Sequence, residues 1–447
     1  MSPRPHALYI AWGFPPSRGS GVHRALATAN GLVEAGFDVT VLTCERETFI
    51  RYTRADPTLE ALVHPDIDVV RVPFDWPLME RDIRRWDRKR ARKPIAWRET
   101  RPLEERRDFP ETGYGPWRER LVTAARQIHT RRPVDVTVAT ANPNVDVEAA
   151  HRLYLDCGVP FVMDQRDAWA LDVFNETVTD DPAILALEAA YVADAHESWL
   201  VNVPIREWYA ARYPDVADRI HVVANGYDRE LAPAAREYPP APDQPLTFGY
   251  VGTITPAMPV VEFLEGWAIA RGEDAGIRDA TAQLWGYLGF FGGLHADHAR
   301  LIERYGTRGV DYRGPVAKTA VRATYETFDV LLLILGSGRY VTSGKVFEYM
   351  ASARPIVSIH HPDVDAARVL DGYPLWFPAA SLEPPDIAAA LEAGAQAART
   401  ATADAYAACA RFATAYDRRN QLGPRLEALR AFVEDRAPRP GAEVAES

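Results

Sequence analysis

A lysine and a glutamate three residues apart are the side chains whose types and spacing most directly suggest chemistry. Lys345 and Glu348 follow the glycine-broken loop GSGRYVTSG at 336–344, and a short helix is predicted over residues 344–353. Positions i and i+3 lie on one helical face, so this cation and this carboxylate project toward the same bound molecule. The loop also delivers backbone N–H groups to a helix N-terminus, which favours an anion. We therefore expect a nucleotide sugar, whose diphosphate requires the cation and whose ribose hydroxyls require the acceptor.

Lysine is rare in this chain, which sharpens the interpretation of Lys345. Only four of the 51 cationic residues are lysine. The chain uses arginine wherever any positive charge suffices, so a lysine at this junction indicates a need for a compact point charge. An ordinary salt bridge between Lys345 and Glu348 on a solvated helix face stays open as the alternative.

The stretch SGKVFEYMASARPIVSI at 343–359 resembles the donor-site signature of GT-B glycosyltransferases similar to family 4, particularly the branch that transfers amino sugars. The motif of that branch runs Ser-Lys-x-x-Glu-Tyr-Met-Ala-x-x-x-Pro. The resemblance implies that Glu348 binds the donor ribose, that Lys345 contacts the diphosphate, and that Ser343 and Gly344 border the donor. Lys345 would then stabilise the charge on the departing nucleoside diphosphate, a catalytic role.

Parallel strands joined by helices are the elements predicted to position these groups. In the N-terminal half, an apolar run at 7–12, the loop GFPPSRGSGVHR, a helical pattern and a strand at 39–42 indicate a βαβ unit. The glycines let backbone approach a ligand at the carboxyl end of the first strand, although their spacing is not the dinucleotide fingerprint. The loop resembles the opening loop of the same family, which implies donor contact for Gly21 and acceptor contact for Gly19 and Arg24.

A second polar group follows the strand predicted at 160–163. The segment RDAW, containing Arg166, Asp167 and Trp169, lies just past the carboxyl end of that strand, where charged residues serve ligands more often than packing. It resembles the Arg-Asp-x-Trp motif of the amino-sugar branch, although Ala170 stands where the family has proline. The resemblance implies catalytic roles for Arg166 and Asp167 and an acceptor-side position for Trp169. An Arg–Asp bridge within the loop stays open.

Residues 73–118 interrupt the alternation of strands and helices with an arginine-rich tract that contains four tryptophans. Three interpretations stay open for it: a solvated, partly helical excursion, a lid over an anionic or aromatic acceptor, and an amphipathic patch that makes peripheral contact with membrane phospholipid. The many acidic residues of the tract weaken the membrane interpretation.

The second half of the chain repeats the parallel-sheet pattern from residue 247 onward. Gly252 and Thr253 follow its first predicted strand, and Val316 belongs to a Gly-Pro-Val turn that resembles the family turn facing the base. The resemblance assigns all three to the donor. The loop GTITPAMP carries neither the arginine nor the lysine of many family members, and Tyr340 stands where many have a second glutamate. The stereochemical outcome is therefore left open.

Length and composition set limits on the kind of protein. At 447 residues the chain is too long for one ordinary core, so two domains are expected. A formal net charge of −11 argues against nucleic acid as a partner. Three dispersed cysteines, no metal-ligand spacing, no signal-peptide pattern and no long apolar run predict a cytoplasmic protein without a metal or a resident cofactor.

Together these features predict an α/β protein of the GT-B class, with two facing Rossmann-like domains, parallel sheets and a C-terminal helix that crosses back to the first domain. The predicted ranges are a first domain at 1–230, a linker at 231–246, a nucleotide-sugar domain at 247–415, a returning helix at 416–435 and a disordered tail at 436–447.

The resemblance implies a glycosyltransferase that moves a sugar from a nucleotide-diphosphate sugar to a small-molecule or lipid-linked acceptor, with retention and without a metal. Two alternatives stay open: a sugar-nucleotide epimerase or hydrolase, and a catalytically degraded nucleotide-binding protein.

Overall fold

The computed structural model describes residues 4–19, 21–273, 277–289, 296–317, 320–336 and 338–436. They form two compact units: the first holds the described residues up to Asp172, Thr177–Ala224 and those from Gln421 onward, and the second holds Val173–Glu176 and Asn225–Asn420. The chain thus passes to the second unit after residue 224 rather than 230, and residues 231–246, predicted as a linker, lie within the second unit. The predicted tail lies, from residue 437 onward, outside the described residues.

The first unit is built on a seven-stranded sheet in the order β3-β2-β1-β4-β5-β8-β9, and every pairing in it is parallel. Its strands are β1 (His6–Ile10), β2 (Asp38–Cys44), β3 (Asp68–Val72), β4 (Val136–Thr140), β5 (Phe161–Gln165), β8 (Glu197–Leu200) and β9 (Ile220–Val222). Its longer helices are α1 (Val22–Glu34), α5 (Arg118–Arg131), α6 (Val145–Cys157), α7 (Pro182–Asp194), α8 (Val203–Arg212) and α16 (Arg418–Arg436), whose residues up to Asn420 belong to the second unit. Strands β1 and β4 are buried along their whole length, as central parallel strands require.

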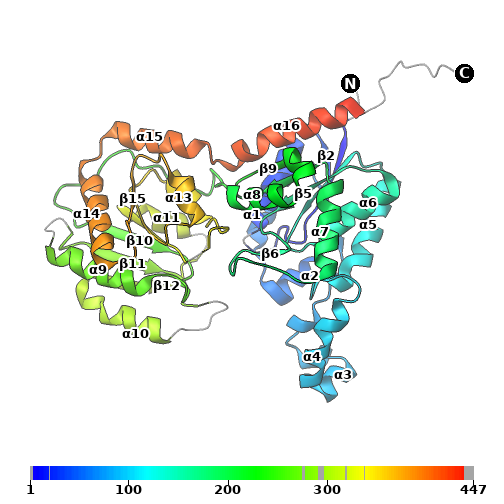
Figure 1. Ribbon diagram of the computed structural model, residues 1–447, viewed down its shortest axis with the longest axis horizontal. Helices are drawn as coiled ribbons and strands as arrows, with labels where there is room; N and C mark the ends of the chain where they lie inside the picture. The colour runs from blue at the N-terminus through cyan, green and yellow to red at the C-terminus, as the bar shows by residue number, and fades with distance from the viewer. Residues whose placement is uncertain are drawn as a thin grey trace, which may run out of the picture. The chain divides into compact units, whose positions relative to one another are not determined.

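The C-terminal helix α16 packs onto the sheet of the first unit. Its apolar residues Leu422, Leu426, Leu429 and Val433 recur at helical spacing and lie in the same core cluster as β1, β2 and α1. Figure 1 shows α16 running along this unit near α1 and β2. The predicted return of the terminal helix to the first domain is therefore confirmed.

The arginine-rich tract forms an excursion from the first unit, as Figure 1 shows for α3 (Arg88–Arg92) and α4 (Pro94–Glu105). Its base joins an aromatic cluster at the end of β1, in which Phe74 stacks on Tyr114 and contacts Trp12 and Trp117 edge-on. The tract is thus partly helical and anchored by buried rings.

The second unit is built on a six-stranded parallel sheet in the order β12-β11-β10-β13-β14-β15. Its strands are β10 (Thr247–Val251), β11 (Thr281–Trp285), β12 (Val310–Gly314), β13 (Val330–Ile334), β14 (Ile356–Ile359) and β15 (Trp376–Pro378). Its helices are α9 (Val260–Glu273), α10 (Ala296–Arg304), α11 (Val321–Glu326), α12 (Lys345–Ala351), α13 (Asp365–Leu370), α14 (Pro384–Thr400) and α15 (Ala403–Thr414). No helix in the described ranges is long and apolar enough to span a membrane.

The helix predicted over residues 344–353 is shorter in the structure, where α12 covers Lys345–Ala351. Ala353 takes a positive φ of 55°, a conformation that no helix continues. With seven residues, α12 has only a small aligned dipole, so the side-chain charge of Lys345 is its main means of attracting an anion.

Candidate functional site

Lys345 begins α12 and reaches the carboxyl end of β10. Its Nζ donates a hydrogen bond of 2.8 Å to the hydroxyl of Tyr250 and lies 4.5 Å from the centre of that ring. Gly252 has a φ of 149°, and a Cβ at that position would lie 2.2 Å from Cε of the lysine. The backbone conformation at position 252 therefore favours glycine, and a side chain there would displace the end of the lysine side chain.

The partly buried ammonium group of Lys345 is incompletely compensated. Burial lowers the pKa of Lys345 to about 8, and the charge of Glu348 opposes this shift. Tyr250 is a neutral partner that uses only one of the three ammonium donors. A bound anion would restore the compensation that burial removes, so the lowered pKa marks a candidate anion site.

Glu348, one turn further along α12, is also partly buried. Oε2 accepts a hydrogen bond of 2.8 Å from the hydroxyl of Tyr325. Burial raises the pKa of Glu348, while that hydrogen bond and the charges of Lys345 and Arg418 act in the opposite direction. A carboxylate has about four acceptor positions, so the contact with Tyr325 leaves room for two hydroxyl donors from a ligand.

The turn ANGYD at residues 224–228 packs close to the carboxylate of Glu348. Arg418 donates hydrogen bonds of 2.7 and 2.6 Å to the two carboxylate oxygens of Asp228 and another of 2.6 Å to the carbonyl of Asn225. Gly226 has a φ of 59°, and a Cβ there would lie 2.6 Å from the carbonyl oxygen of Tyr416. This turn therefore holds Arg418 near Glu348, a neighbour that sequence reasoning missed because 70 residues separate the two in the chain.

The other predicted donor residues come from several separate loops. The carbonyl of Thr253 accepts a hydrogen bond of 2.9 Å from Tyr250, which places that loop beside Lys345. The carbonyl of Ser343 accepts from the N–H of Val346 at 3.1 Å, and Gly344 is exposed with open space where a Cβ would stand. Val316 follows β12, which β11 separates from β10. Gly21 belongs to the first unit.

The first unit contains its own pocket, of about 320 Å³, at the carboxyl ends of its central strands. Trp12, Gly13, Ser17, Gly19, Gly21, Val22, Glu111, Tyr114, Asn142, Pro143 and Arg166 line it. The guanidinium of Arg166 lies against Gly21, where a Cβ would come within 2.5 Å of Nη1. Asn142 donates a hydrogen bond of 2.6 Å to Asp167. The pocket thus brings together the predicted residues Gly19, Gly21 and Arg166, with Asp167 held at its rim.

Two predicted acceptor-side residues lie outside this pocket. Arg24 is 2 % exposed and forms a buried ion pair with Asp164, which is fully buried. Trp169 packs between Phe109 and Tyr191, with ring centroids 5.4 and 6.0 Å away. These contacts are internal to the unit and favour a structural role for Arg24 and Trp169, whereas their acceptor-side role stays a prediction that the structure does not test.

Sequence reasoning also missed several residues that line the pocket. Glu111 accepts hydrogen bonds of 2.9 and 3.0 Å from the first backbone N–H groups of α6, and burial raises its pKa to about 7. Trp12 and Tyr114 contribute rings 5.4 Å apart. Tyr114 and Glu111 come from the base of the arginine-rich tract, so nothing local indicated that they join residues from the end of β1. The position of Trp12 just after β1 was the one available signal.

Comparison with known proteins adds information about the fold. No protein-family model and no curated protein matches the chain. Among solved structures, sucrose-phosphate synthase from Thermosynechococcus elongatus is 14 % identical, with a TM-score of 0.60 over 97 % of this chain and 100 % of that one. HepE from Anabaena, in complex with UDP, is 13 % identical, with a TM-score of 0.62 over 96 % and 100 %. A Listeria monocytogenes protein assigned as a UDP-N-acetylglucosamine 2-epimerase is 10 % identical, with a TM-score of 0.56 over 97 % and 98 %.

The chain has the GT-B fold. Two parallel α/β sheets and nearly complete coverage of these structures confirm the predicted fold class. At such low identities the likeness concerns the fold alone, and the fold is shared by transferases and by a protein assigned as an epimerase. The chemistry must therefore be argued from the two sites.

Proposed function

We propose that this protein is a glycosyltransferase that uses a UDP-sugar, or another nucleotide-diphosphate sugar, as its donor. The observation that carries the proposal is the incompletely compensated pair Lys345 and Glu348 on one face of α12, at the carboxyl edge of the second sheet. HepE, which has the same fold, was solved with UDP, and this supports the choice of nucleotide.

The two side chains have different roles in this proposal. Glu348 accepts hydrogen bonds from the ribose hydroxyls and so contributes to ground-state binding. Lys345 contacts the diphosphate, whose negative charge grows as the sugar departs, so its interaction strengthens in the transition state. Retention without a protein nucleophile is part of the proposal, and no side chain is assigned that role.

We assign the acceptor, a small molecule or a lipid-linked sugar, to the pocket of the first unit. Arg166 supplies guanidinium donors there, and Asn142 holds Asp167 by a hydrogen bond of 2.6 Å. Arg166→Ala should lower kcat/KM by roughly 10- to 100-fold, the usual cost of losing a charge-assisted hydrogen bond, and leave UDP affinity unchanged. Steady-state kinetics and calorimetry on the same preparation check both parts. An equal loss of UDP binding would place Arg166 in the donor site instead.

Metal independence is a further part of the proposal. Within the part of the chain that the structure describes, no group of three or more His, Cys, Asp or Glu side chains is arranged to hold a metal ion. Turnover should persist in excess EDTA. Loss of turnover that Mg²⁺ or Mn²⁺ restores would overturn this part.

The function is tested by a thermal-shift screen of nucleoside diphosphates, followed by product analysis with the matching nucleotide sugar. We expect one nucleoside diphosphate to stabilise the protein, and sugar to appear on a hydroxylated acceptor only when that acceptor is added. Epimerised or hydrolysed sugar from the donor alone, at the rate seen with acceptor, would favour the epimerase or hydrolase. Binding without turnover of any donor would favour the degraded nucleotide-binding protein.

A further inference from the structure

The part of the arginine-rich tract that extends furthest from the first unit has a charge opposite to that of the whole protein. Residues 77–107, here called the basic tip, contain twelve Arg or Lys and six Asp or Glu, a net charge of +6 in a chain whose net charge is −11. Figure 1 shows α3 and α4, which make up most of the tip, projecting from the unit.

The basic tip has a small packed core of its own. The guanidinium of Arg90 lies between the rings of Trp86 and Trp97, 4.1 and 4.5 Å from their centres. Arg90 also donates a hydrogen bond of 2.9 Å to the carbonyl of Glu80, and the indole N–H of Trp97 donates to Asp87 at 3.2 Å. These contacts fix α3 against α4, so the surface of the tip has a defined arrangement of side chains.

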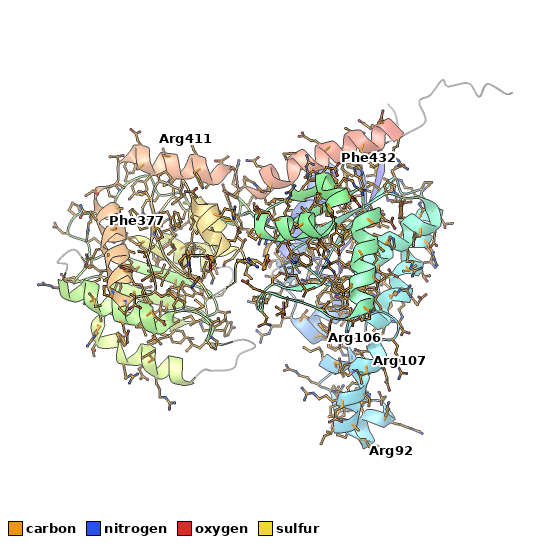
Figure 2. The ribbon with its side chains drawn as sticks, viewed as in Figure 1. Arg92, Arg106, Arg107, Phe377, Arg411 and Phe432 are labelled. Atoms are coloured by element: carbon orange, nitrogen blue, oxygen red, sulfur yellow. The ribbon has the colours of Figure 1, made fainter. Side chains whose placement is uncertain are left out.

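Most acidic residues of the basic tip form ion pairs or hydrogen bonds with other residues of the protein. Asp82 pairs with Arg84, Glu104 with Lys89 and Glu105 with Arg101. Glu80 pairs with an arginine outside the tip, and Asp87 accepts from the backbone N–H of Arg90. Within the described ranges, the side chains of six exposed cations of the tip form no ion pair or hydrogen bond: Arg81, Arg88, Arg92, Lys93, Arg98 and Arg107. The acids therefore leave a net positive surface, part of which Figure 2 shows in the outward-pointing Arg92 and Arg107.

Apolar side chains are exposed on the same tip. Ile83, Ile95 and Leu103 are 70, 77 and 66 % exposed. A hollow of about 580 Å³ runs beside Ile95 and is lined by the two tryptophans, by further apolar side chains and by Arg81 and Arg98. Exposed isoleucine and leucine among unpaired cations are typical of proteins that lie in a membrane interface, where apolar side chains enter the acyl boundary and cations meet lipid phosphates.

We propose that the basic tip docks the protein onto a membrane surface rich in anionic phospholipid. Nucleic acid would use the cations but would leave three large exposed apolar side chains without a role. The proposal is independent of glycosyl transfer, because it concerns a surface outside both candidate sites.

Vesicle co-sedimentation of the full chain tests this proposal. The test variant is the triple substitution Arg88→Gln, Arg92→Gln and Arg98→Gln. The matched control is Arg131→Gln, Arg278→Gln and Arg411→Gln, which removes the same charge from exposed arginines elsewhere in the chain. All six side chains are exposed, so both variants should unfold at the wild-type temperature.

We expect wild type and the control to bind phosphatidylcholine vesicles containing phosphatidylglycerol and not pure phosphatidylcholine, with binding that weakens as salt rises. The tip variant should bind roughly 100-fold more weakly, given the usual contribution of each basic residue near an anionic surface. A second variant, Ile83→Gln with Ile95→Gln, should also bind at least tenfold more weakly at unchanged charge. Equal loss of vesicle binding in the tip variant and the control, or full binding by the isoleucine variant, would overturn the proposal.

Discussion

Each unit holds a cation and a carboxylate near the carboxyl edge of its parallel sheet. The two pairs differ in how many hydrogen bonds they form within the protein. Arg24 donates to Asp164 from Nε at 2.8 Å and from Nη2 at 2.6 Å, and its Nη1 donates to the carbonyl of Val223 at 2.9 Å. Lys345 and Glu348 each contact one tyrosine hydroxyl and stay partly accessible.

We propose that this difference separates a structural pair from a ligand-binding pair. Both members of the Arg24 pair are buried and hydrogen-bonded within the protein, so neither is accessible to a ligand. The Lys345 pair carries pKa shifts in the direction that burial produces, lowered for the lysine and raised for the glutamate. A molecule with a diphosphate and two adjacent hydroxyls would supply what the second pair lacks.

The largest expected effect is on stability and comes from the structural pair. Arg24→Met should lower the free energy of unfolding by about 3–5 kcal/mol, because it leaves Asp164 buried and unpaired. Urea unfolding measures this. Arg24→Met combined with Asp164→Leu should recover much of the loss, since no unpaired charge remains. If Arg24→Met alone is as stable as wild type, the Arg24–Asp164 pair is not a structural pair and the contrast with Lys345 and Glu348 fails.

The next effect is on turnover and comes from Lys345. Lys345→Ala should cut kcat several hundredfold, about 3–4 kcal/mol, with little change in unfolding, because the lost interaction is strongest in the transition state. Lys345→Arg should recover only part of the rate, since a planar fork is bulkier and directed differently from a point charge. Full activity with arginine would mean that charge alone matters. If Lys345→Ala turns over at the wild-type rate, Lys345 does not contact the diphosphate. Arg18 and Arg339 would then be the next cations to test.

A smaller effect should follow from pH. In the free protein the pKa of Lys345 is about 8, below its ordinary value, so the ammonium is charged at lower pH and is lost as pH rises through that value. The contribution of Lys345 to UDP affinity should therefore be nearly constant up to about pH 8 and then fall by up to about tenfold per pH unit. Lys345→Arg should not show this fall in affinity above pH 8. The titration of UDP itself affects both proteins equally, so it cancels when their pH profiles are compared. Parallel pH profiles for both would contradict the assignment.

Much of the fold follows from the sequence. The apolar runs at 7–12 and 39–42 predicted β1 and β2, because central parallel strands are buried on both faces and leave a continuous hydrophobic signal. The short edge strands β3 and β15 lack that signal, because their residues are largely half-buried.

The candidate sites were only partly accessible from the sequence. Lys345 and Glu348 lie in one continuous motif, whereas their partners Tyr250 and Tyr325 come from other elements and show no local pattern. For Arg24, spacing alone does not reveal whether the donors of the guanidinium already form hydrogen bonds within the protein. That information requires the position of Asp164, 140 residues away.

The claim that Glu348 and Lys345 form a nucleotide-sugar site is tested most directly by the coupling between Glu348 and the ribose hydroxyls. Calorimetry would compare UDP with 2′,3′-dideoxy-UDP on wild type and on Glu348→Gln. Removing the hydroxyls should weaken wild-type binding by about 1.5–3 kcal/mol, the value of charge-assisted hydrogen bonds, and should have little effect on the glutamine variant. If the hydroxyls contribute equally in both proteins, Glu348 does not bind the ribose and the account of this site is wrong.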